Sequence, residues 1–228
     1  MRYFVSAASL LAFIVLLTDV CAADWPRWRG PNDNGLIDSG NPPIEWSETK
    51  NVRWKAAVPG LGHATPIVWG DRIFLQTAVK VQNEGVITDA VYHFRVYALD
   101  RKTGKTLWEK TLRESSPADD SHHETASYAS SSGLTDGETL FAYFGSHGLY
   151  ALDLDGNLKW EVDFGDMRTA RSFGEGSSPA LHGDKLIVNW DHEGDSFIVA
   201  LDKTTGKELW RQSRDEGTTW GTPYILTH

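Results

Sequence analysis

The chain has 228 residues, of which 31 are acidic and 22 are basic, so its formal net charge at pH 7 is −9. This acidity argues against general binding to nucleic acid or to anionic lipid, because both attract basic surfaces. The single cysteine, Cys21, falls within the first 22 residues. The sequence after it therefore offers no disulfide and no thiolate ligand for a metal.

Residues 1–22 are predicted to be a cleavable signal peptide. Arg2 is the only early charge, residues 10–17 form an apolar core, and Val20-Cys21-Ala22 is a small-residue cleavage pattern. The core is too short to span a bilayer, and an uncleaved anchor is the alternative interpretation. We therefore expect a periplasmic or secreted protein with no membrane span after removal of the signal.

Residues 23–50 are expected to form an N-terminal extension, and residues 51–228 a partial repeat domain. The extension opens with Asp24-Trp25-Pro26-Arg27-Trp28-Arg29-Gly30-Pro31. The segment 51–58 reads Asn-Val-Arg-Trp-Lys-Ala-Ala-Val and resembles the last strand of the repeat described next. We expect it to be a strand whose three partners are missing.

A short phrase occurs three times, at residues 98–108, 151–160 and 200–210, and its copies start 53 and 49 residues apart. A period of this size indicates stacked copies of one supersecondary unit. In each copy an apolar strand ends at Ala-Leu, an Asp accepts turn amides, a Gly takes a positive φ and a Trp opens the next strand. We predict a positive φ at Gly104 and Gly206, and a different turn in the middle copy, which is one residue shorter.

A second marker precedes each hairpin. Thr65-Pro66, Ser178-Pro179 and Thr222-Pro223 each open a short apolar run, and Ser131-Ser132 holds the same place without proline. A polar turn, a β-rich run and the repeated phrase follow, which gives four short strands per unit. No part of the sequence after the signal shows sustained helical periodicity.

Four-stranded units at this period are typical of β-propeller blades. The sequence therefore predicts an all-β fold, a β-propeller that is incomplete here, with about three blades plus flanking strands. We place the blades at residues 64–112, 127–164 and 177–213, with a fourth beginning at Trp220. Because a closed propeller has about 4–8 blades, we expect this chain to be the N-terminal part of a longer protein.

The phrase A-x-D-x-x-T-G-K-x-x-W resembles the tryptophan-docking repeat of the pyrroloquinoline-quinone-type (PQQ-like) β-propellers. That family includes the quinoprotein alcohol dehydrogenases and the propeller protein of the outer-membrane assembly machinery. Residues 24–31 are similar to the start of many exported members, and the resemblance extends over residues 24–228. It implies further C-terminal blades of the same chain, since members usually have seven or eight. It implies no activity by itself, because enzymes and non-enzymes share the phrase.

The tryptophans of the repeat are Trp54, Trp108, Trp160 and Trp210. Their position recurs with the blade, so we interpret each indole as a wedge between neighbouring blades. The alternative is stacking on a sugar or a quinone. We predict that Trp108 and Trp210 are largely buried, that Trp160 is comparable, and that Trp210 is the more exposed if its next blade is absent.

Two clusters contain residue types that bind metals. His122-His123-Glu124 lies close to Asp119-Asp120, but adjacent histidines on a strand point to opposite sides. The run 191–195, Asp-His-Glu-Gly-Asp, lacks the alternating acidic pattern of a calcium loop. We interpret the first as a solvated loop between blades and the second as a hairpin loop, and we assign no metal ligand.

The residues just before each blade are candidates for a ligand face, because the innermost strand of a blade starts near the central channel. These candidates are His63, Tyr128, Arg171, Glu175 and Trp220, and Arg168 lies in the same loop as Arg171. We expect them to form an arc around one mouth that suits a polar or anionic ligand. The alternative interpretation is that they satisfy backbone groups around the hub.

The leading functional hypothesis is an exported PQQ-like propeller that acts as a binding or scaffold module at the cell envelope. Its partners would be protein segments or a polymer, and nucleic acid is not expected. Enzymatic activity is disfavoured, because the family's dehydrogenases often use a disulfide of adjacent cysteines and a catalytic Asp, and no residue here is matched to either. We assign no catalytic residue and no cofactor.

Two alternatives stay open. The first is a PQQ-dependent alcohol or sugar dehydrogenase, with a Ca²⁺ or similar ion beside the quinone, whose catalytic half lies beyond residue 228. The second is a carbohydrate-binding propeller that uses additional tryptophans. Those tryptophans are Trp25, Trp28, Trp190 and Trp220.

Overall fold

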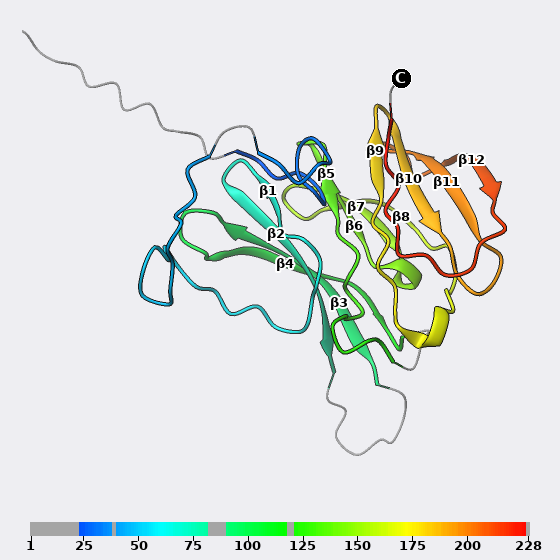
Figure 1. The fold of residues 1–228 in the computed structure, drawn as a ribbon, viewed down its shortest axis with the longest axis horizontal. Coiled ribbons are helices and arrows are strands. Elements are labelled where there is room, and N and C mark those ends of the chain that lie inside the picture. Colours follow the sequence, from blue (N-terminus) through cyan, green and yellow to red (C-terminus); the bar gives the residue numbers. More distant parts are fainter. Residues whose placement is uncertain (1–22, 38–39, 82–89, 118–120, 227–228) are drawn as a thin grey trace, which may run out of the picture.

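The computed structural model describes residues 23–37, 40–81, 90–117 and 121–226, so the predicted signal peptide lies outside the described residues. Within them the chain forms three four-stranded antiparallel sheets, each a meander of consecutive strands (Figure 1). Two isolated 3₁₀ turns, η1 Gly145–His147 and η2 Ala170–Ser172, are the only helical elements of this part of the chain. None of its helical elements is long and apolar enough to cross a membrane.

The three sheets are the predicted propeller blades, in sequence order. The first blade consists of β1 Ile67–Trp69, β2 Arg72–Lys80, β3 Tyr92–Asp100 and β4 Thr106–Ser115. The second consists of β5 Leu134–Thr135, β6 Thr139–Tyr143, β7 Leu149–Asp153 and β8 Leu158–Val162. The third consists of β9 Ala180–His182, β10 Lys185–Trp190, β11 Phe197–Asp202 and β12 Glu208–Ser213.

Two flanking strands that the sequence predicted are not formed. Residues 51–58 contain no strand, although Trp54 occupies the docking position of the repeat. Residues 214–226, where a fourth blade was expected to begin, contain no strand either. Short apolar runs form strands only where a partner strand supplies hydrogen bonds, and these two segments have none in the described part of the chain.

The third and fourth strands of every blade pair in the same register. Ala98 pairs with Trp108, and the corresponding alanines of the other blades pair with their tryptophans. A β-bulge follows each of these pairs, between the Ala and the Leu of the repeated phrase. The tryptophan is therefore the third residue of its strand rather than the first, as the sequence had suggested.

The turns of the repeated phrase have the predicted glycine geometry. Gly104 and Gly206 both have φ 72°, and Gly156 has φ 88°. In the first turn the Asp100 carboxylate accepts hydrogen bonds from the backbone amides of Lys102 and Thr103. The Thr103 hydroxyl and amide hydrogen bonds keep the pKa of Asp100 below its usual value.

The middle turn differs, as its shorter length predicted. The carboxylate of Asp153 accepts hydrogen bonds from the amides of Asp155 and Asn157, and from the Asn157 side chain. The amide of Gly156 donates a hydrogen bond to the carbonyl of Asp153, three residues earlier. The amides of Gly104 and Gly206 each donate to the carbonyl of the Asp four residues earlier. The missing residue is therefore absorbed within the turn, and the strands on either side keep their register.

Three of the four repeat tryptophans dock on the turn of the following blade. The indole Nε1 donates a hydrogen bond of 3.0 Å to a turn carbonyl in all three cases: Trp54 to Arg101, Trp108 to Leu154 and Trp160 to Lys203. The turn glycine is required because a Cβ at Gly104 would lie 2.4 Å from the Trp54 ring. The wedge interpretation therefore describes the contact correctly.

The degree of burial predicted for these tryptophans was too high, whereas the greater exposure of Trp210 was predicted correctly. Trp108 and Trp160 are half-buried, and Trp210 is 42% exposed. Trp108 and Trp160 each cover a turn of the neighbouring blade and pack against a phenylalanine of their own blade, Phe74 or Phe141, at the edge of a core rather than inside it. Trp210 has no turn to dock on among the described residues.

A separate hydrophobic core fills each junction between blades. Alternate residues of β6 divide between the two cores, because successive side chains of a strand point to opposite faces. Leu140, Ala142 and Phe144 belong to the core shared with the first blade. Phe141 and Tyr143 belong to the core shared with the third blade. The middle blade is therefore buried on both faces.

The N-terminal segment joins the inner strands of two blades. Trp25 forms an antiparallel bridge with Val68 of β1, with backbone hydrogen bonds of 2.8 and 2.9 Å. The carbonyl of Pro26 accepts a hydrogen bond from the amide of Thr135 in β5. Figure 1 shows this segment, in dark blue, beside β1 and β5. The extension is thus attached to the blades at the hub.

Candidate functional site

The loops that lead into each blade gather at one end of the sheets, because β1, β5 and β9 all start there. We call this end the blade-start face and define it by residues 61–66, 121–133, 163–179 and 214–223. The β2–β3, β6–β7 and β10–β11 connections lie at the same end, since each strand runs antiparallel to its neighbour. All five candidate ligand residues belong to this face.

A chain of hydroxyl groups links the start of one blade to the next. The amide of Thr65 donates to the Ser132 hydroxyl at 2.9 Å, and the amide of Ser132 donates to the Ser178 hydroxyl at 2.9 Å. The amide of Ser178 in turn donates to the Thr222 hydroxyl at 3.1 Å. The Ser or Thr of each blade marker therefore satisfies a backbone donor of the preceding blade. Sequence reasoning missed this role, although the recurrence of a hydroxyl at this position was its signal.

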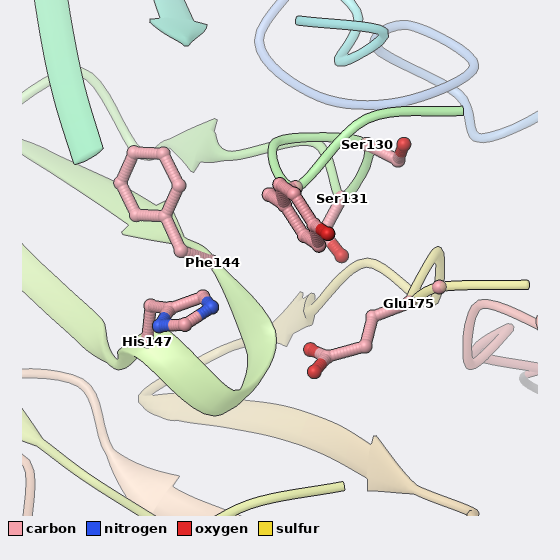
Figure 2. A pocket seen from close by; sticks show the side chains of 7 residues that line it. Ser130, Ser131, Phe144, His147 and Glu175 are labelled. Atoms are coloured by element: carbon pink, nitrogen blue, oxygen red, sulfur yellow. The ribbon is translucent and has the colours of Figure 1, made fainter. Parts of the chain in front are cut away.

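Glu175 is bound to the hairpin of the second blade. Its carboxylate accepts hydrogen bonds from the amide of Ser146 at 2.8 Å and from the Ser146 hydroxyl at 2.5 Å. Gly145 makes room for it, since a Cβ there would lie 1.3 Å from a Glu175 oxygen. Figure 2 shows the carboxylate reaching toward the turn that carries His147. Glu175 therefore holds the third blade's lead-in loop against the second blade.

A small pocket lies between this carboxylate and the lead-in loop of the second blade (Figure 2). About 20 Å³ of it is open to the centres of water molecules, which is room for one or a few waters. Ligand sites for drug-sized molecules occupy about 300–1,000 Å³. The residues that line it are Tyr128, Ser130, Ser131, Phe144, His147, Gly174 and Glu175.

His147 forms the wall of this pocket opposite Glu175. Its ring stacks on Phe94 with centroids 3.9 Å apart, and its Nδ1 lies 3.0 Å from the Ser115 hydroxyl. Burial, together with the nearby Arg113 guanidinium, lowers the pKa of His147 to about 4. The imidazole is therefore neutral at pH 7. Nothing in the sequence distinguished this histidine, which lies in a short hairpin loop.

Asp191 occupies the corresponding junction after the third blade. Its buried carboxylate accepts hydrogen bonds from Arg214 at 2.7 Å and from the Thr219 hydroxyl at 2.7 Å. Burial raises the pKa of Asp191, but the hydrogen bonds from Arg214, Thr219 and Asn189 outweigh it, so the pKa lies below its usual value. This carboxylate also ties a lead-in loop to a blade.

The described residues of the two segments with metal-binding residue types, 122–124 and 191–195, do not bring their side chains together as a set of metal ligands. Glu193 accepts hydrogen bonds from the amide and hydroxyl of Thr218, and the His123 ring nitrogen bonds to Thr125. No group of three or more acidic, His or Cys side chains suited to a metal ion occurs within the described residues. Asp119 and Asp120 lie outside them.

The predicted ligand residues follow one another along the blade-start face. The amide of His63 bonds to the carbonyl of Ala129, next to Tyr128. Tyr128 and Glu175 line the first pocket, and Glu175 and Trp220 line the next one. The arc is therefore present as a succession of neighbours. That these residues bind a ligand stays a prediction.

Their side chains do not converge on one cavity. His63 and Arg171 are exposed, Glu175 turns inward, and Tyr128 packs against the rings of Tyr92 and His122. Trp220 is 46% exposed, and its Nε1 donates a 2.8 Å hydrogen bond to the carbonyl of Gly174. An open, loop-built surface thus replaces the expected mouth.

Two of the tryptophans considered for sugar binding are built into the structure. Trp190 is 2% exposed and stacks on Phe197, with ring centroids 5.8 Å apart. Trp25 packs on Gly30, where a Cβ would lie 2.8 Å from its ring. Trp28 and Trp220 are exposed. This removes Trp190 from the proposed set, because a buried indole offers no face to a sugar, whereas Trp25 is half-buried.

The model of the family described as outer membrane protein assembly factor BamB, a PQQ-like repeat family, matches residues 38–175. The chain belongs to this family. The match spans the first and second blades and the loop that leads into the third. The PQQ-like β-propeller fold predicted from the repeated phrase is therefore confirmed.

Individual relatives include enzymes. The chain is 29% identical to quinoprotein ethanol dehydrogenase of Pseudomonas putida over 154 residues, which is 62% of this chain and 23% of that protein. The chain thus spans about a quarter of the length of this curated relative. Among solved structures, europium-containing methanol dehydrogenase is 19% identical with a TM-score of 0.47, covering 65% of this chain and 24% of that one. BamB from Moraxella catarrhalis is 21% identical with a TM-score of 0.39, covering 68% and 42%.

Proposed function

We propose that this PQQ-like propeller protein is exported and acts as a binding or scaffold module at the cell envelope, with the blade-start face as its binding surface. The observation that carries the proposal is the use of the buried carboxylates. Glu175 and Asp191, the acidic groups best placed for chemistry, hold loops to blades through internal hydrogen bonds. Phe173, Trp220 and Arg171 of the same face, in contrast, are exposed.

Aromatic and arginine side chains support a binding role. Trp, Tyr and Arg are the residues that most often dominate the energy of protein interfaces. Trp220 and Phe173 are exposed on the blade-start face, and Arg171 lies two residues from Phe173. Location at the envelope rests on the signal-like residues 1–22, and their cleavage is part of the proposal.

The similarity to quinoprotein ethanol dehydrogenase favours a second candidate, a PQQ-dependent dehydrogenase. The described residues do not fit a quinone with its metal ion. About 20 Å³ of the pocket beside Glu175 is open to the centres of water molecules. Pockets that hold ligands as large as a quinone cofactor occupy about 300–1,000 Å³. Oxygens of Glu175 and Asp191 already accept hydrogen bonds from protein groups. We derive no redox step from these residues.

Site-specific photocrosslinking in living cells tests the binding role. A photoreactive phenylalanine replaces the exposed His123 on the blade-start face, and a matched variant carries it at the exposed Lys110 on β4. We expect adducts with an envelope component from position 123 and none from position 110. Equal adducts from both positions, or none from position 123, would contradict the proposal.

A further inference from the structure

Two aromatic rings from different loops form a shallow surface on the blade-start face. Phe173, in the loop before the third blade, is 37% exposed, and Trp220, in the loop after it, is 46% exposed. Their ring centroids are 6.4 Å apart and their planes differ by 33°. Exposed aromatic faces at this inclination form a nearly continuous platform for an extended ligand.

Hydrogen bonds hold the two aromatic residues in place. They involve the indole N–H of Trp220 and the backbone carbonyl of Phe173, so they leave the ring faces unused. The Trp220 Nε1 is bonded to the carbonyl of Gly174, and its Cδ1 lies 3.2 Å from the Cβ position of Gly176. The carbonyl of Phe173 accepts a hydrogen bond of 3.0 Å from the amide of His123. A ligand that stacks on these faces would find them already ordered, which lowers the entropic cost of binding.

The same loops are tied into one unit. The amide of Ala170 donates to the Thr218 hydroxyl at 2.8 Å, which joins the loops that carry Phe173 and Trp220. The ring of His123 meets Phe173 edge to face at 5.1 Å. Three lead-in loops therefore contribute to one surface.

Backbone strain is concentrated beside the platform. Arg171 and Ser172 have φ 56° and 51°, two consecutive left-handed residues that are not glycine. Such residues cost of order 1–3 kcal/mol each and cluster at ligand clamps and active sites. The strained pair immediately precedes Phe173, so the strain coincides with the position of an exposed ring.

Arg171 provides an uncompensated positive charge at this place. Seven arginines of the described residues form ion pairs with carboxylates. Arg171 is exposed and forms none there, whereas its neighbour Arg168 donates to the backbone carbonyl of Glu193. An exposed guanidinium that forms no ion pair among the described residues, two residues before Phe173, favours an anionic ligand on this face.

We propose that Phe173, Trp220 and Arg171 bind an acidic polysaccharide, a glycan whose sugars carry carboxylates. The negative faces of aromatic rings attract the polarised C–H groups of a sugar ring. The guanidinium matches a carboxylate with two parallel hydrogen bonds. The inference rests on the proposed binding role and names its ligand class.

Calorimetric titration with defined glycans tests this site. The probes are oligogalacturonate, alginate and hyaluronate, and the methyl ester of oligogalacturonate is the uncharged control. We expect saturable binding of at least one acidic glycan, and weaker binding of the ester. Loss of one hot-spot contact of about 1.4 kcal/mol corresponds to a tenfold weaker affinity, so Trp220→Ala and Arg171→Ala should each weaken acidic-glycan binding about tenfold.

Matched variants separate the ring from the charge. Trp46→Ala removes an exposed indole outside the site and should leave binding unchanged, and Trp220→Phe should retain most of it. Arg171→Ala is a surface change, so it tests the site even if Trp220→Ala fails to fold. Arg171→Ala should not alter the affinity for the ester.

Three outcomes would overturn the glycan site. The first is no binding of any of the three acidic glycans, and the second is equal weakening by Trp46→Ala and Trp220→Ala. The third is binding of an acidic Glu-Tyr copolymer, instead of a glycan, with the same sensitivity to Arg171→Ala. If crosslinks at position 123 persist while no glycan binds, the glycan inference fails and the binding role stands. If both fail, the binding role fails as well.

Discussion

The indole Nε1 of Trp160 donates a hydrogen bond of 3.0 Å to the backbone carbonyl of Lys203 in the next blade. The same contact recurs at Trp54 and Trp108, each on the turn that follows a repeated Ala-Leu-Asp. The indole also lies over the turn glycine, so hydrogen bond and ring contact act on one turn. A repeat built this way transmits stability from blade to blade through nearest neighbours.

Replacing the docking glycine should destabilise the protein more than replacing an open one. A Cβ at Gly206 would lie 2.7 Å from the Trp160 ring, whereas Gly183 has nothing within 4 Å, and both have a positive φ. The left-handed backbone alone costs alanine about 1–2 kcal/mol, and overpacking adds about 1–3. We therefore expect Gly206→Ala to lower the free energy of unfolding by about 3 kcal/mol in urea denaturation, and Gly183→Ala by about 1. Equal losses would contradict the docking account.

Two substitutions of Trp108 separate the contribution of the docking hydrogen bond to stability from the contribution of the ring. Trp108→Phe keeps an aromatic ring but leaves the Leu154 carbonyl without its indole donor. We expect a loss of about 1 kcal/mol for this variant and about 3 kcal/mol for Trp108→Ala, as for other aromatic truncations. Thermal and urea unfolding measure both. Trp28→Ala, at an exposed site, should change stability by less than about 0.5 kcal/mol.

The stability that the chain of hydroxyl groups provides at the blade starts should depend on the presence of a hydroxyl, whether serine or threonine supplies it. Ser178→Ala leaves the buried amide of Ser132 without an acceptor, which costs about 1–3 kcal/mol. Ser178→Thr keeps the hydroxyl, and threonine occupies the corresponding places at residues 65 and 222. We expect Ser178→Thr to retain most of the stability that Ser178→Ala loses. Equal losses for the two variants would show that the hydroxyl makes no contribution.

Stability should fall as the pH is lowered from about 6.5 toward 4. The pKa of His147 is about 4 in the folded protein against 6.5 in the unfolded chain, because burial disfavours the imidazolium. Between these values the unfolded state binds more protons, so stability is complete above pH 6.5 and declines by about 3 kcal/mol by pH 4. Urea unfolding at a series of pH values measures this slope. His147→Gln should flatten it, and an unchanged slope would exclude His147 as its source.

The repeat was predictable from sequence because its chemistry is local. Asp100 and Gly104 lie within one turn, and their hydrogen bonds and φ follow from residue type and spacing. The alternation of apolar residues likewise predicted the strands, including β10 over Lys185–Trp190. The incomplete burial of Trp108 and Trp160 was harder to predict, because it depends on which segments lie against each ring.

The internal role of the site residues depends on contacts between blades. Glu175 and Ser146 are 29 residues apart and meet only when two blades pack together. Gly145 gave a faint signal, since a glycine inside a hairpin marks close approach of another group. The hydroxyls at Ser132 and Ser178 were noted in sequence only as strand markers, because a single sequence does not reveal the partner of a hydroxyl. His147 gave no signal, because a polar hairpin residue is usually exposed.

The central claim is that the carboxylates at the blade junctions hold the described blades and loops together, and our proposal is that this chain binds partners without a quinone. Calorimetric titration with PQQ, in the presence and in the absence of Ca²⁺, tests this most directly. We predict no saturable PQQ binding and no alcohol oxidation with an artificial electron acceptor, and we predict that Glu175→Gln lowers stability through its contact with Ser146. Saturable PQQ binding that is abolished by Glu175→Gln, together with alcohol oxidation, would contradict the account.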